Sequence, residues 1–435
     1  MPPLSDPASS EASSAEPAAP SRAWAWALTL TATSTMAVSY LDRQTLAVLG
    51  PTVKQQLHID NEAFGWLISA FSIAYLVGSP ISGRLVDHIG ARRGLLGAVL
   101  LWSAVAAAHA LVPGFAVLFA LRIALGLAES PSFPGAAQTV HRALPPADRA
   151  RGLGILFTGS SFGAMVAPKL ATFIASKFSV ERGFRVAFLG TAIVGLLWVP
   201  LWLAVAFRKD MRALLDHRPA PPIAERASAG DRGGLLSLLA HPAVLRASLV
   251  VIASAPLINL YFNWGANYLV AEHGLVQAQV GNYLWLPPIL FDLGAISFGH
   301  RASRARAAGA DGVPPRLLAI AGVLMCAGAL IPLARTPWEV TLLISVSLSG
   351  GGGLFSLATA EMMTRVPASR VSAAGGLTAA AQSLAYIVAN PLIGRSIDVT
   401  KHYTLIILAL TAWVIPGTLG WLLWKQRTAG PLQTA

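Results

Sequence analysis

Charged side chains are scarce in this sequence. Asp, Glu, Lys and Arg make up 12% of its 435 residues, whereas hydrophobic residues make up 54%. An ordinary soluble domain carries roughly 25% charged residues, so a chain this poor in charge cannot cover the surface of a water-soluble protein of its size. The composition excludes an ordinary soluble enzyme and predicts an all-α integral membrane protein, with the lipid bilayer as its solvent.

Cysteine and the motifs of metal and phosphate chemistry are nearly absent. Cys326 is the single cysteine, which excludes an intrachain disulfide and a cysteine metal site. The sequence has no HExxH zinc motif and no glycine-rich phosphate-binding loop. We therefore expect no enzyme activity, no metal and no cofactor, and a proton gradient would be the source of energy.

Long hydrophobic runs, by contrast, are abundant. A helix needs about 20 largely apolar residues to cross a bilayer. Twelve such runs predict twelve transmembrane helices, in two sets of six, near residues 23–49, 63–85, 93–112, 115–139, 152–176, 184–207, 243–270, 277–299, 316–334, 338–360, 371–394 and 403–424.

Basic residues outnumber acidic ones, and the net charge is +12. Most of them fall in the loops on one side of the predicted membrane, including Arg92–Arg93 and the stretch from Arg208 to Arg232. Basic loops remain on the cytoplasmic side, which predicts a multi-pass protein of the bacterial inner membrane with both termini cytoplasmic. The basicity thus indicates topology, and we expect no nucleic-acid partner.

Composition also divides the chain into segments. Residues 1–21 are rich in Ala, Ser and Pro and predict a disordered cytoplasmic tail. A first bundle is predicted at 22–207 and a second at 243–424. Between them lies a cytoplasmic linker at 208–242, with Pro, Gly and charges of both signs, and a second tail follows at 425–435.

The two predicted bundles share local sequence features. Three glycines spaced by 13 and 5 residues occur in both. In addition, a five-residue segment of the first half that ends in proline is weakly similar to one in the second half. These features are Gly65, Gly78 and Gly83 against Gly281, Gly294 and Gly299, and 164–168 against 387–391. Two repeats of six helices with a cytoplasmic linker are typical of transporters whose halves rock around a midplane site.

The loop after the second predicted helix carries a recognisable motif. Residues 83–94 read GRLVDHIGARRG, and this resembles the loop signature of the major facilitator superfamily. We expect Gly83 to let helices approach closely and Asp87 to accept hydrogen bonds from a helix N-terminus, or to pair with an arginine, as the bundles close. Gly90, Arg92 and Arg93 complete this predicted gating motif.

Three further segments resemble the anion:cation symporter branch of that superfamily, which includes bacterial hexuronate, galactonate and glucarate permeases. They are SYLDR at 39–43, RIALGLAESPSFP at 122–134 and DLGA at 292–295. The resemblance implies the twelve-helix major facilitator fold, a monomer, and proton-coupled symport of a small organic anion such as a hexuronate or an aldonate.

The charged residues that we single out inside predicted spans are Asp42, Arg43, Arg122 and Glu129. Each would cost about 2.5–3.5 kcal/mol at mid-membrane, so they must pair or line a wet cavity. Arg43 is our candidate for the substrate carboxylate, since a guanidinium matches it bidentately. The resemblance implies the same role, with Tyr40 and Tyr75 as hydroxyl ligands. Proton coupling is assigned to Asp42, Glu129 and Arg122. The alternative is a static network between helices.

Arg43 and Asp42 are neighbours in sequence but point roughly 100° apart on a helix. We therefore expect them to serve different partners.

Uncharged polar residues in other spans are weaker candidates for substrate contacts. They are Ser160, Ser161, Asn263, Gln382 and Asn390. The glycines around the two serines favour close helix packing, and the amides could face the site or only bridge helices. Lys169 could be a second anion contact.

Other functions remain open at this point. The main alternative is a proton-driven exporter of a drug or metabolite on the same fold, and a non-transporting membrane sensor is a third. The adjacent Asp42 and Arg43 and the two tyrosines favour a hydrophilic anion over an apolar drug. The direction of net flux under a pH gradient separates import from export.

Overall fold

The computed structural model describes residues 21–216, 235–367 and 370–424, and this part of the chain is helical with no strand. The predicted N-terminal tail, the middle of the linker and the C-terminal tail lie outside it. The helices of the first half are α1 (Arg22–Leu57), α2 (Asn61–Ile89), α3 (Ala91–Ala108), η1 (His109–Leu111), α4 (Phe115–Glu129), α5 (Ser132–Ala143), α6 (Pro146–Ala175), α7 (Val180–Leu196), α8 (Trp198–Ala206) and α9 (Lys209–Asp216).

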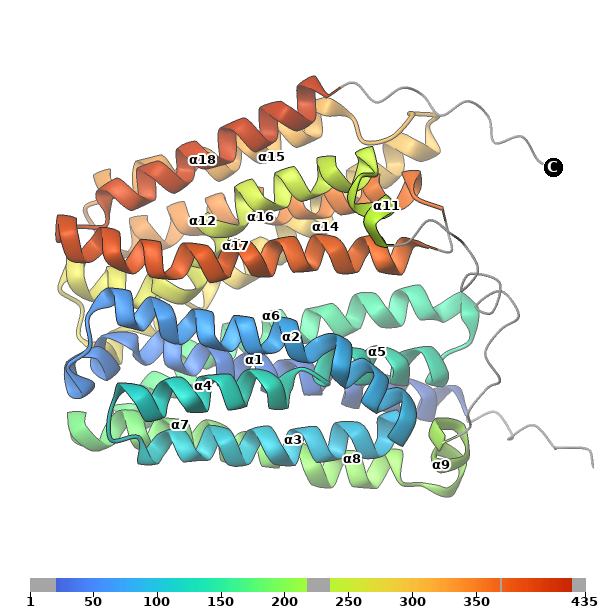
Figure 1. Cartoon of the computed structure of the whole chain (residues 1–435), viewed down its shortest axis with the longest axis horizontal. Coiled ribbons are helices and arrows are strands. Elements are labelled where there is room, and N and C mark those ends of the chain that lie inside the picture. The colour runs from blue at the N-terminus through green and yellow to red at the C-terminus, as the bar shows by residue number, and fades with distance from the viewer. Residues whose placement is uncertain (1–20, 217–234, 368–369, 425–435) are drawn as a thin grey trace, which may run out of the picture.

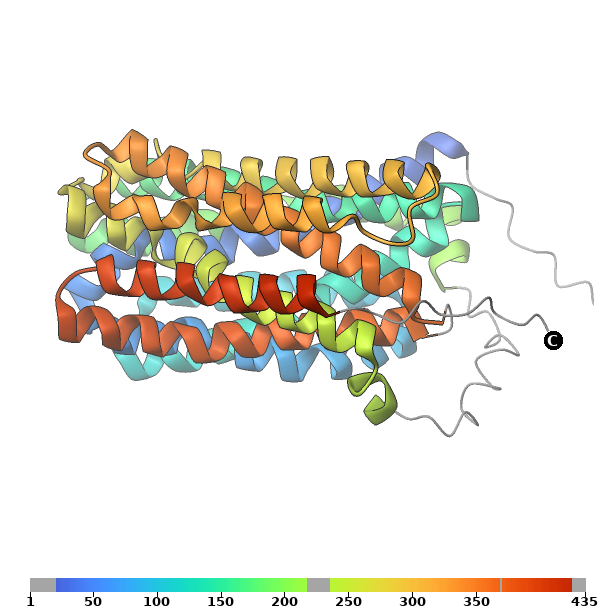
Figure 2. The same ribbon diagram turned by 90° about the horizontal axis from the view of Figure 1, so that it is seen from above.

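The second half has a similar set of helices. They are α11 (Leu235–Leu239), α12 (Pro242–His273), α13 (Gln277–Val280), α14 (Leu286–Ala307), α15 (Pro315–Met325), η2 (Cys326–Leu333), α16 (Pro337–Arg365), α17 (Val371–Thr400) and α18 (Thr404–Leu423). Figure 1 shows α1 to α9 and α11 to α18 as two groups that lie side by side, and Figure 2 shows the long helices running along one common direction.

Ten helical segments of the described chain are long and apolar enough to cross a membrane. Helices α1 and α14 are not among them, and both carry several charged residues, such as Asp42, Arg43 and Lys54 in α1 and Arg301 and Arg304 in α14. Both nevertheless lie in parallel with the apolar helices (Figure 1). The fold is therefore an all-α membrane fold, and the count of twelve spans stays a prediction.

Prolines divide two of the predicted spans. The span predicted at 115–139 is split into α4 and α5 at Ser130–Pro131, and the one predicted at 277–299 begins with the short α13 before α14. Proline lacks an amide hydrogen and clashes with the preceding turn, so it interrupts a helix or begins one. Pro287 and Pro288 accordingly stand in the first turn of α14.

The linker predicted at 208–242 is partly helical. Helix α9 occupies 209–216, and α11 and the start of α12 occupy 235–239 and 242 onward. Leu215 and Met211 of α9 are buried against the first half, so these apolar side chains anchor the beginning of the linker to the bundle.

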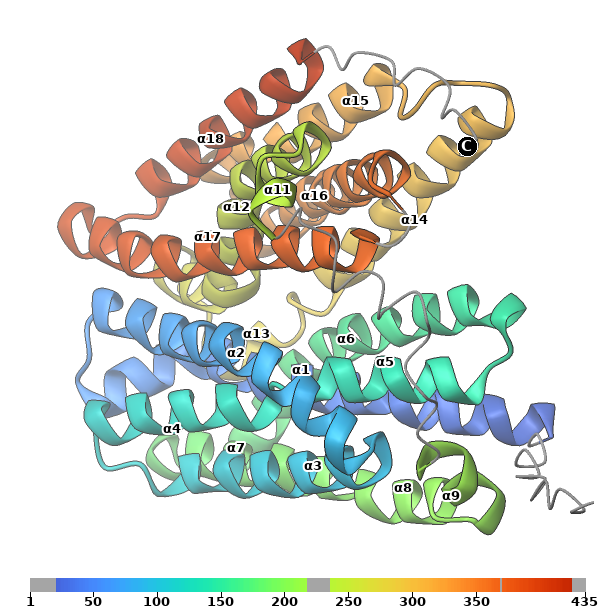
Figure 3. The same cartoon turned by 45° about the vertical axis from the view of Figure 1, so that its right-hand side comes forward.

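The two ends of the bundle differ, and we name them here. Helix α1 begins and α18 ends at one end, the terminal end, where α9 and α11 also lie (Figure 1). The opposite end, the distal end, carries the connections from α1 to α2 and from α17 to α18. Figure 3 shows α17 of the second half lying along α2 of the first half.

Glycines set the closest approaches between the halves. A Cβ on Gly65 of α2 would collide with the backbone of Asn390 and Pro391 in α17, and one on Gly281 would collide with the backbone of Pro168 in α6. The first glycine of each predicted triplet, Gly65 or Gly281, therefore meets the proline segment of the opposite half, which supports the repeat. Close backbone approach of this kind needs small residues.

Two further glycine sites concern helix packing: Gly83 does not take part in it, and a run of four glycines in α16 does. A Cβ on Gly83 meets nothing within 4 Å, so our explanation that Gly83 allows close helix packing is wrong for this conformation. The run from Gly350 to Gly353 is buried in α16, and Cβ atoms there would meet α14, α15 and α12. These four glycines are used for helix packing.

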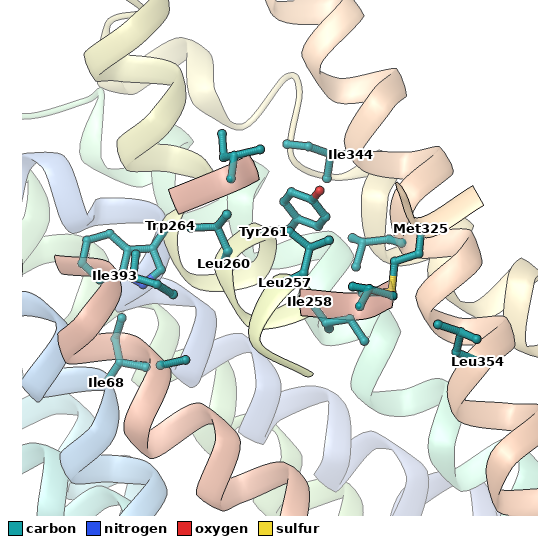
Figure 4. Close-up of a cluster of buried hydrophobic side chains, with 14 of the residues drawn as sticks. Ile68, Leu257, Ile258, Leu260, Tyr261, Trp264, Met325, Ile344, Leu354 and Ile393 are labelled. Atoms are coloured by element: carbon teal, nitrogen blue, oxygen red, sulfur yellow. The ribbon is translucent and has the colours of Figure 1, made fainter. Parts of the chain in front are cut away.

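A hydrophobic cluster fills the second half and reaches the first half. Trp264 of α12 is fully buried and meets Phe64 of α2 edge to face, with ring centroids 5.2 Å apart. Figure 4 shows Ile68 of α2 and Ile393 of α17 in this cluster, on the same side as Trp264. The halves thus share a packed apolar contact toward the distal end.

Candidate functional site

A buried ion pair lies at the centre of the first half. The Arg43 Nε on α1 donates to Glu129 Oε2 on α4 at 2.7 Å, and the Ser39 hydroxyl donates to the same oxygen at 2.7 Å. The Glu129 side chain is fully buried, whereas 16% of the Arg43 side chain remains exposed. The sequence required buried charges either to pair or to line a wet cavity, and Arg43 and Glu129 form a pair in which Arg43 is the less buried member.

Aromatic rings surround the Arg43 guanidinium. Its Cζ lies 4.9 Å from the centre of the Tyr40 ring, 4.7 Å from that of Phe71 and 4.4 Å from that of Tyr75. Phe71 and Tyr75 stack on each other, 5.9 Å between centroids. Cation–π contacts of this kind stabilise and orient a cation. We call Tyr40, Phe71 and Tyr75 the aromatic cage of Arg43.

Phe71 also contacts the second buried arginine. The Arg122 Cζ lies 4.8 Å from the centre of the Phe71 ring, and the Arg122 Nε donates to the Leu67 carbonyl at 3.4 Å. Sequence reasoning missed Phe71. It stands four residues before Tyr75 in α2, on the same helix face, and this spacing is the signal that could have found it.

Several polar atoms of this cluster are buried and have no hydrogen-bond partner among the described residues. They are both carboxylate oxygens of Asp42, the Oε1 of Glu129, the Nη2 of Arg43 and the Nη1 of Arg122. An unsatisfied buried polar atom costs about 1–3 kcal/mol or more when charged. These atoms are therefore the ones through which the cluster can bind further groups.

Asp42 and Arg43 face different surroundings, as their helical offset predicts. Asp42 is 3% exposed and lies beside Thr191 of α7. A Cβ on Gly195 would be 3.8 Å from its Oδ2. Asp42 thus points into the interior of the first half, away from the aromatic cage.

The predicted serines lie on α6. Ser160 lies beside Tyr40, and Ser161 lies beside Asp292 of α14. Glycines 159 and 163 beside them pack against the α1 backbone at Thr33 and Ala37. Residues 159–163 also fit the G-x-S-x-G spacing of a hydrolase nucleophile elbow, but that elbow is a strand–turn–helix. Here the segment lies inside one helix.

The amide candidates belong to a network within the second half. Asn390 is fully buried, accepts from Asn259 Nδ2 at 2.8 Å and from Trp264 Nε1 at 3.0 Å, and donates to the Tyr386 carbonyl at 2.8 Å. Its amide is thus occupied in bridging α12 and α17. Asn263 is only partly buried and donates to Asn259.

Gln382 lies one turn before Tyr386 in α17. Its amide donates to the Tyr386 hydroxyl at 3.1 Å, and both side chains are partly exposed.

The predicted gating motif lies at the terminal end, between α2 and α3. Asp87 is exposed and accepts from Gln138 Nε2 of α5 at 2.6 Å, which is a contact within the first half. Gly90 has φ +86°, where a side chain would be strained. Arg92 is buried under the Phe207 ring at 4.4 Å, whereas Arg93 is exposed. Arg92 therefore also anchors the loop to α8.

Lys169 is exposed at the surface of α6. Its Nζ lies 5.0 Å from the centre of the Trp285 ring in the second half. It therefore lies at the junction of the halves and outside the aromatic cage.

Curated relatives carry names of one substrate class. The chain is 29% identical over 60% of its length to the hexuronate transporter of Bacillus subtilis, and the match spans 60% of that protein. It is 24% identical over 83% of its length to the Escherichia coli hexuronate transporter, over 85% of that protein. The probable galactarate/D-glucarate transporter of B. subtilis is 24% identical, with 89% of both chains covered.

Solved structures match the fold. A bacterial homolog of the human lysosomal transporter Spinster, in its inward-facing and occupied conformation, superposes with a TM-score of 0.74 at 15% identity. The match covers 93% of this chain and 97% of that one. The nucleoside transporter NupG gives 0.69 at 13% identity, over 92% and 100%.

The family profile of the Major Facilitator Superfamily matches residues 32–390. That range includes the Arg43–Glu129 pair, the aromatic cage, the gating motif and most of α17. With the all-α fold and the apolar helices, this establishes that the chain is a multi-pass membrane protein, that it is not an enzyme, and that it belongs to the Major Facilitator Superfamily.

Proposed function

We propose that this protein is a secondary transporter that carries a small organic anion, of the sugar-acid class, across the bacterial inner membrane by alternating access coupled to proton movement. Supporting this, the curated relatives are named as transporters of hexuronates and of galactarate/D-glucarate. The Arg43 site supplies the chemistry for a carboxylate.

The geometry of Arg43 is the observation that carries the proposal. Its Nε is held by Glu129, and aromatic rings lie within 5 Å of its Cζ. Its Nη2 has no hydrogen-bond partner among the described residues. The Nη2 is buried in this conformation, and once a ligand enters the site the Nη edge would match its carboxylate bidentately.

The same pair suggests how a proton is coupled. A substrate carboxylate on Arg43 would compete with Glu129 for the guanidinium, since both are anions at one cation. Glu129 released from Arg43 would take up one proton at a carboxylate oxygen, and it would return that proton when the substrate leaves and the pair reforms. Arg122 also contacts the Phe71 ring and would keep positive charge near Glu129 during the exchange. Asp42 is the second candidate proton carrier.

Hydroxyl groups around Arg43 would bind the rest of a sugar acid. Tyr40 and Tyr75 carry hydroxyls beside Arg43, and Ser160 neighbours Tyr40. Gln382, Asn263 and Ser161 are partly exposed polar groups on helices at the junction of the halves. Asn390 would act indirectly, by holding Trp264 and Asn259 in place.

Uptake into proteoliposomes tests the proposal. Purified protein would be supplied with labelled hexuronates, aldonates, aldarates and small carboxylates under an inward proton gradient, and Arg43→Ala would be compared with Arg43→Lys. We expect gradient-stimulated uptake of at least one sugar acid, a loss of at least about 100-fold in Arg43→Ala, and partial activity in Arg43→Lys, which keeps the charge but loses the planar fork.

Two results would contradict the proposal. No uptake of any acid by the wild-type protein would exclude this substrate class, and uptake unaffected by Arg43→Ala would exclude this site. Gradient-driven efflux instead of uptake would favour the proton-driven exporter.

A further inference from the structure

One carboxylate joins the two halves at the distal end. Asp398, near the end of α17, accepts from the backbone N–H of Asn61 at 3.3 Å, from the Asn61 Nδ2 at 2.7 Å and from the backbone N–H of Glu62 at 2.8 Å. Asn61 and Glu62 are the first two residues of α2. A side chain of the second half thus caps a helix of the first half.

The contact has a physical reason to be strong. The first N–H groups of a helix have no partner within the helix, and the N-terminus carries a partial positive charge. A carboxylate that accepts from such groups makes charge-assisted hydrogen bonds. Gly394, one turn earlier in α17, lies against the Asn61 backbone so closely that a Cβ would collide with it. That close approach positions Asp398 over the end of α2.

Neighbouring groups reinforce the contact from the first half. The Lys54 Nζ, in the last turn of α1, donates to Asn61 Oδ1 at 2.5 Å, and Asp60 caps α2 from within its own half through the Ala63 N–H. Lys54 therefore fixes the Asn61 amide, whose Nδ2 faces Asp398. Other polar contacts also join the halves, and in one of them Gln277 Nε2 donates to the Val48 carbonyl at 2.7 Å.

The other ends of the same two helices have a different arrangement. Helices α2 and α17 run antiparallel, so that the C-terminal end of α2 and the start of α17 both lie at the terminal end (Figures 1 and 3). Asp87 there accepts from Gln138 of its own half. In this structure the carboxylate of α17 at the distal end bonds across the halves, and that of α2 at the terminal end bonds within its half.

We propose that Asp398 is the latch of the distal gate: it caps α2 when that end is closed and releases it when the end opens. This inference rests on the alternating access of the proposed function. Asp398 then determines how long the site faces the terminal end, and the Asn61–Lys54 pair holds its partner in position. Loss of the carboxylate removes three hydrogen bonds of the closed form, so the population shifts toward the open distal end.

Distances between spin labels test the latch without any substrate. Leu111→Cys and Leu333→Cys place labels on exposed residues of the α3–α4 and α15–α16 connections, one in each half, in a Cys326→Ala background. Pulsed electron paramagnetic resonance would compare this protein with Asp398→Asn and Asp398→Ala. We expect the open-to-closed ratio at the distal end to rise at least about tenfold, the effect of losing one or two charge-assisted bonds.

A matched control is available at the same end. Glu272 of α12 accepts from the Tyr403 N–H at 2.9 Å, another carboxylate at a helix start, but both partners belong to the second half. Glu272→Gln removes the same charge and should leave the distances unchanged. Asn61→Ala, on the partner side, should shift them in the same direction as Asp398→Asn by a smaller amount, and it covers the case in which the Asp398 variants do not fold.

The outcomes separate the latch from the transport proposal. Distances in Asp398→Asn and Asn61→Ala that coincide with the background would overturn the latch, and so would an equal shift in Glu272→Gln. A wild-type protein that takes up no anion would contradict the proposed function, but it would not affect the spin-label distances, which are measured without substrate.

Discussion

At the scale of single residues, the aromatic cage holds the Arg43 guanidinium in a fixed orientation for binding an anion. The guanidinium is bonded by Glu129 along one edge and lies near three rings. Phe71 is the ring shared with Arg122. It contributes no hydrogen bond, so its role is to orient the two cations.

Replacement of Phe71 tests that role. Phe71→Leu keeps an apolar side chain but removes the ring that both guanidinium groups contact, and a cation–π contact contributes about 0.5–2 kcal/mol. We expect KM for the anion to rise about threefold to thirtyfold with a smaller change in the maximal rate, measured by uptake at varied substrate concentration.

A control for this variant is Phe115→Leu, at the start of α4, whose ring packs only on Phe119 among the ring contacts of the described chain. Its KM should stay at the wild-type value. A Phe71→Leu protein with an unchanged KM would show that the ring does not position Arg43.

Glu129 gives a second prediction at this scale. A glutamine has nearly the same shape and can still accept from Ser39 and Arg43, but it cannot carry the exchanged proton. We expect Glu129→Gln to retain exchange of labelled for unlabelled substrate across the membrane and to lose accumulation driven by a pH gradient. Both are measured in the same proteoliposomes.

Accumulation that survives in Glu129→Gln would assign the proton to another group, of which Asp42 is the nearest candidate. Asp42→Asn run in parallel then serves as the comparison, because Asp42 points into the first half and not toward Arg43.

At the scale of helices, glycine determines how closely the elements of this protein pack. Gly352 of α16 faces the Phe291 carbonyl of α14, and a Cβ there would collide with that backbone. Backbone cannot move aside as the end of a flexible side chain can. The glycine run in α16 therefore fixes the spacing of α14 and α16.

Gly352→Ala tests this packing. The added methyl group must push α14 and α16 apart, and overpacking of a filled interior costs about 1–3 kcal/mol. We expect the apparent melting temperature of the detergent-solubilised protein to fall by several degrees, measured by the loss of monodisperse protein after heating.

Gly376→Ala in α17 is the matched control, since a Cβ there meets nothing within 4 Å. Alanine is favoured over glycine in a helix by about 1 kcal/mol, so this variant should melt at the wild-type temperature or slightly above it. Equal melting of the two variants would contradict the packing argument.

At the scale of the whole molecule, the two ends of the bundle differ in charge and in contacts. The gating motif with Arg92 and Arg93 lies at the terminal end, and the Asp398 contact lies at the distal end. The positive-inside rule predicts that the terminal end faces the cytoplasm. The distal end would then face the outside.

Cysteine labelling of intact cells tests this orientation. In a Cys326→Ala background, Leu111→Cys at the distal end should react with a membrane-impermeant maleimide added from outside. Arg93→Cys, exposed at the terminal end, should react only after the cells are lysed. The opposite pattern would invert the predicted topology and, with it, the assignment of the distal gate to the outside.

The sequence by itself determined the class of the fold and the identity of the central charges. Low charge and long apolar runs predict a bundle of membrane-spanning helices, because a helix in lipid satisfies its own backbone polar groups. The cost of buried charge similarly required that Arg43 and Glu129 either pair or line a wet cavity. The weak glycine repeat was also readable, since Gly65 and Gly281 hold equivalent places between the halves.

Only the tertiary structure decided which groups meet across long separations in the chain. No local pattern indicates that Asp398 caps the start of α2, that Phe71 contacts two arginines, or that Asn390 is bonded to Trp264 and Asn259. Periodicity specifies the face of a helix on which a residue lies, but the partner of that face depends on how the helices pack. The predicted role of Gly83 in close packing failed for the same reason.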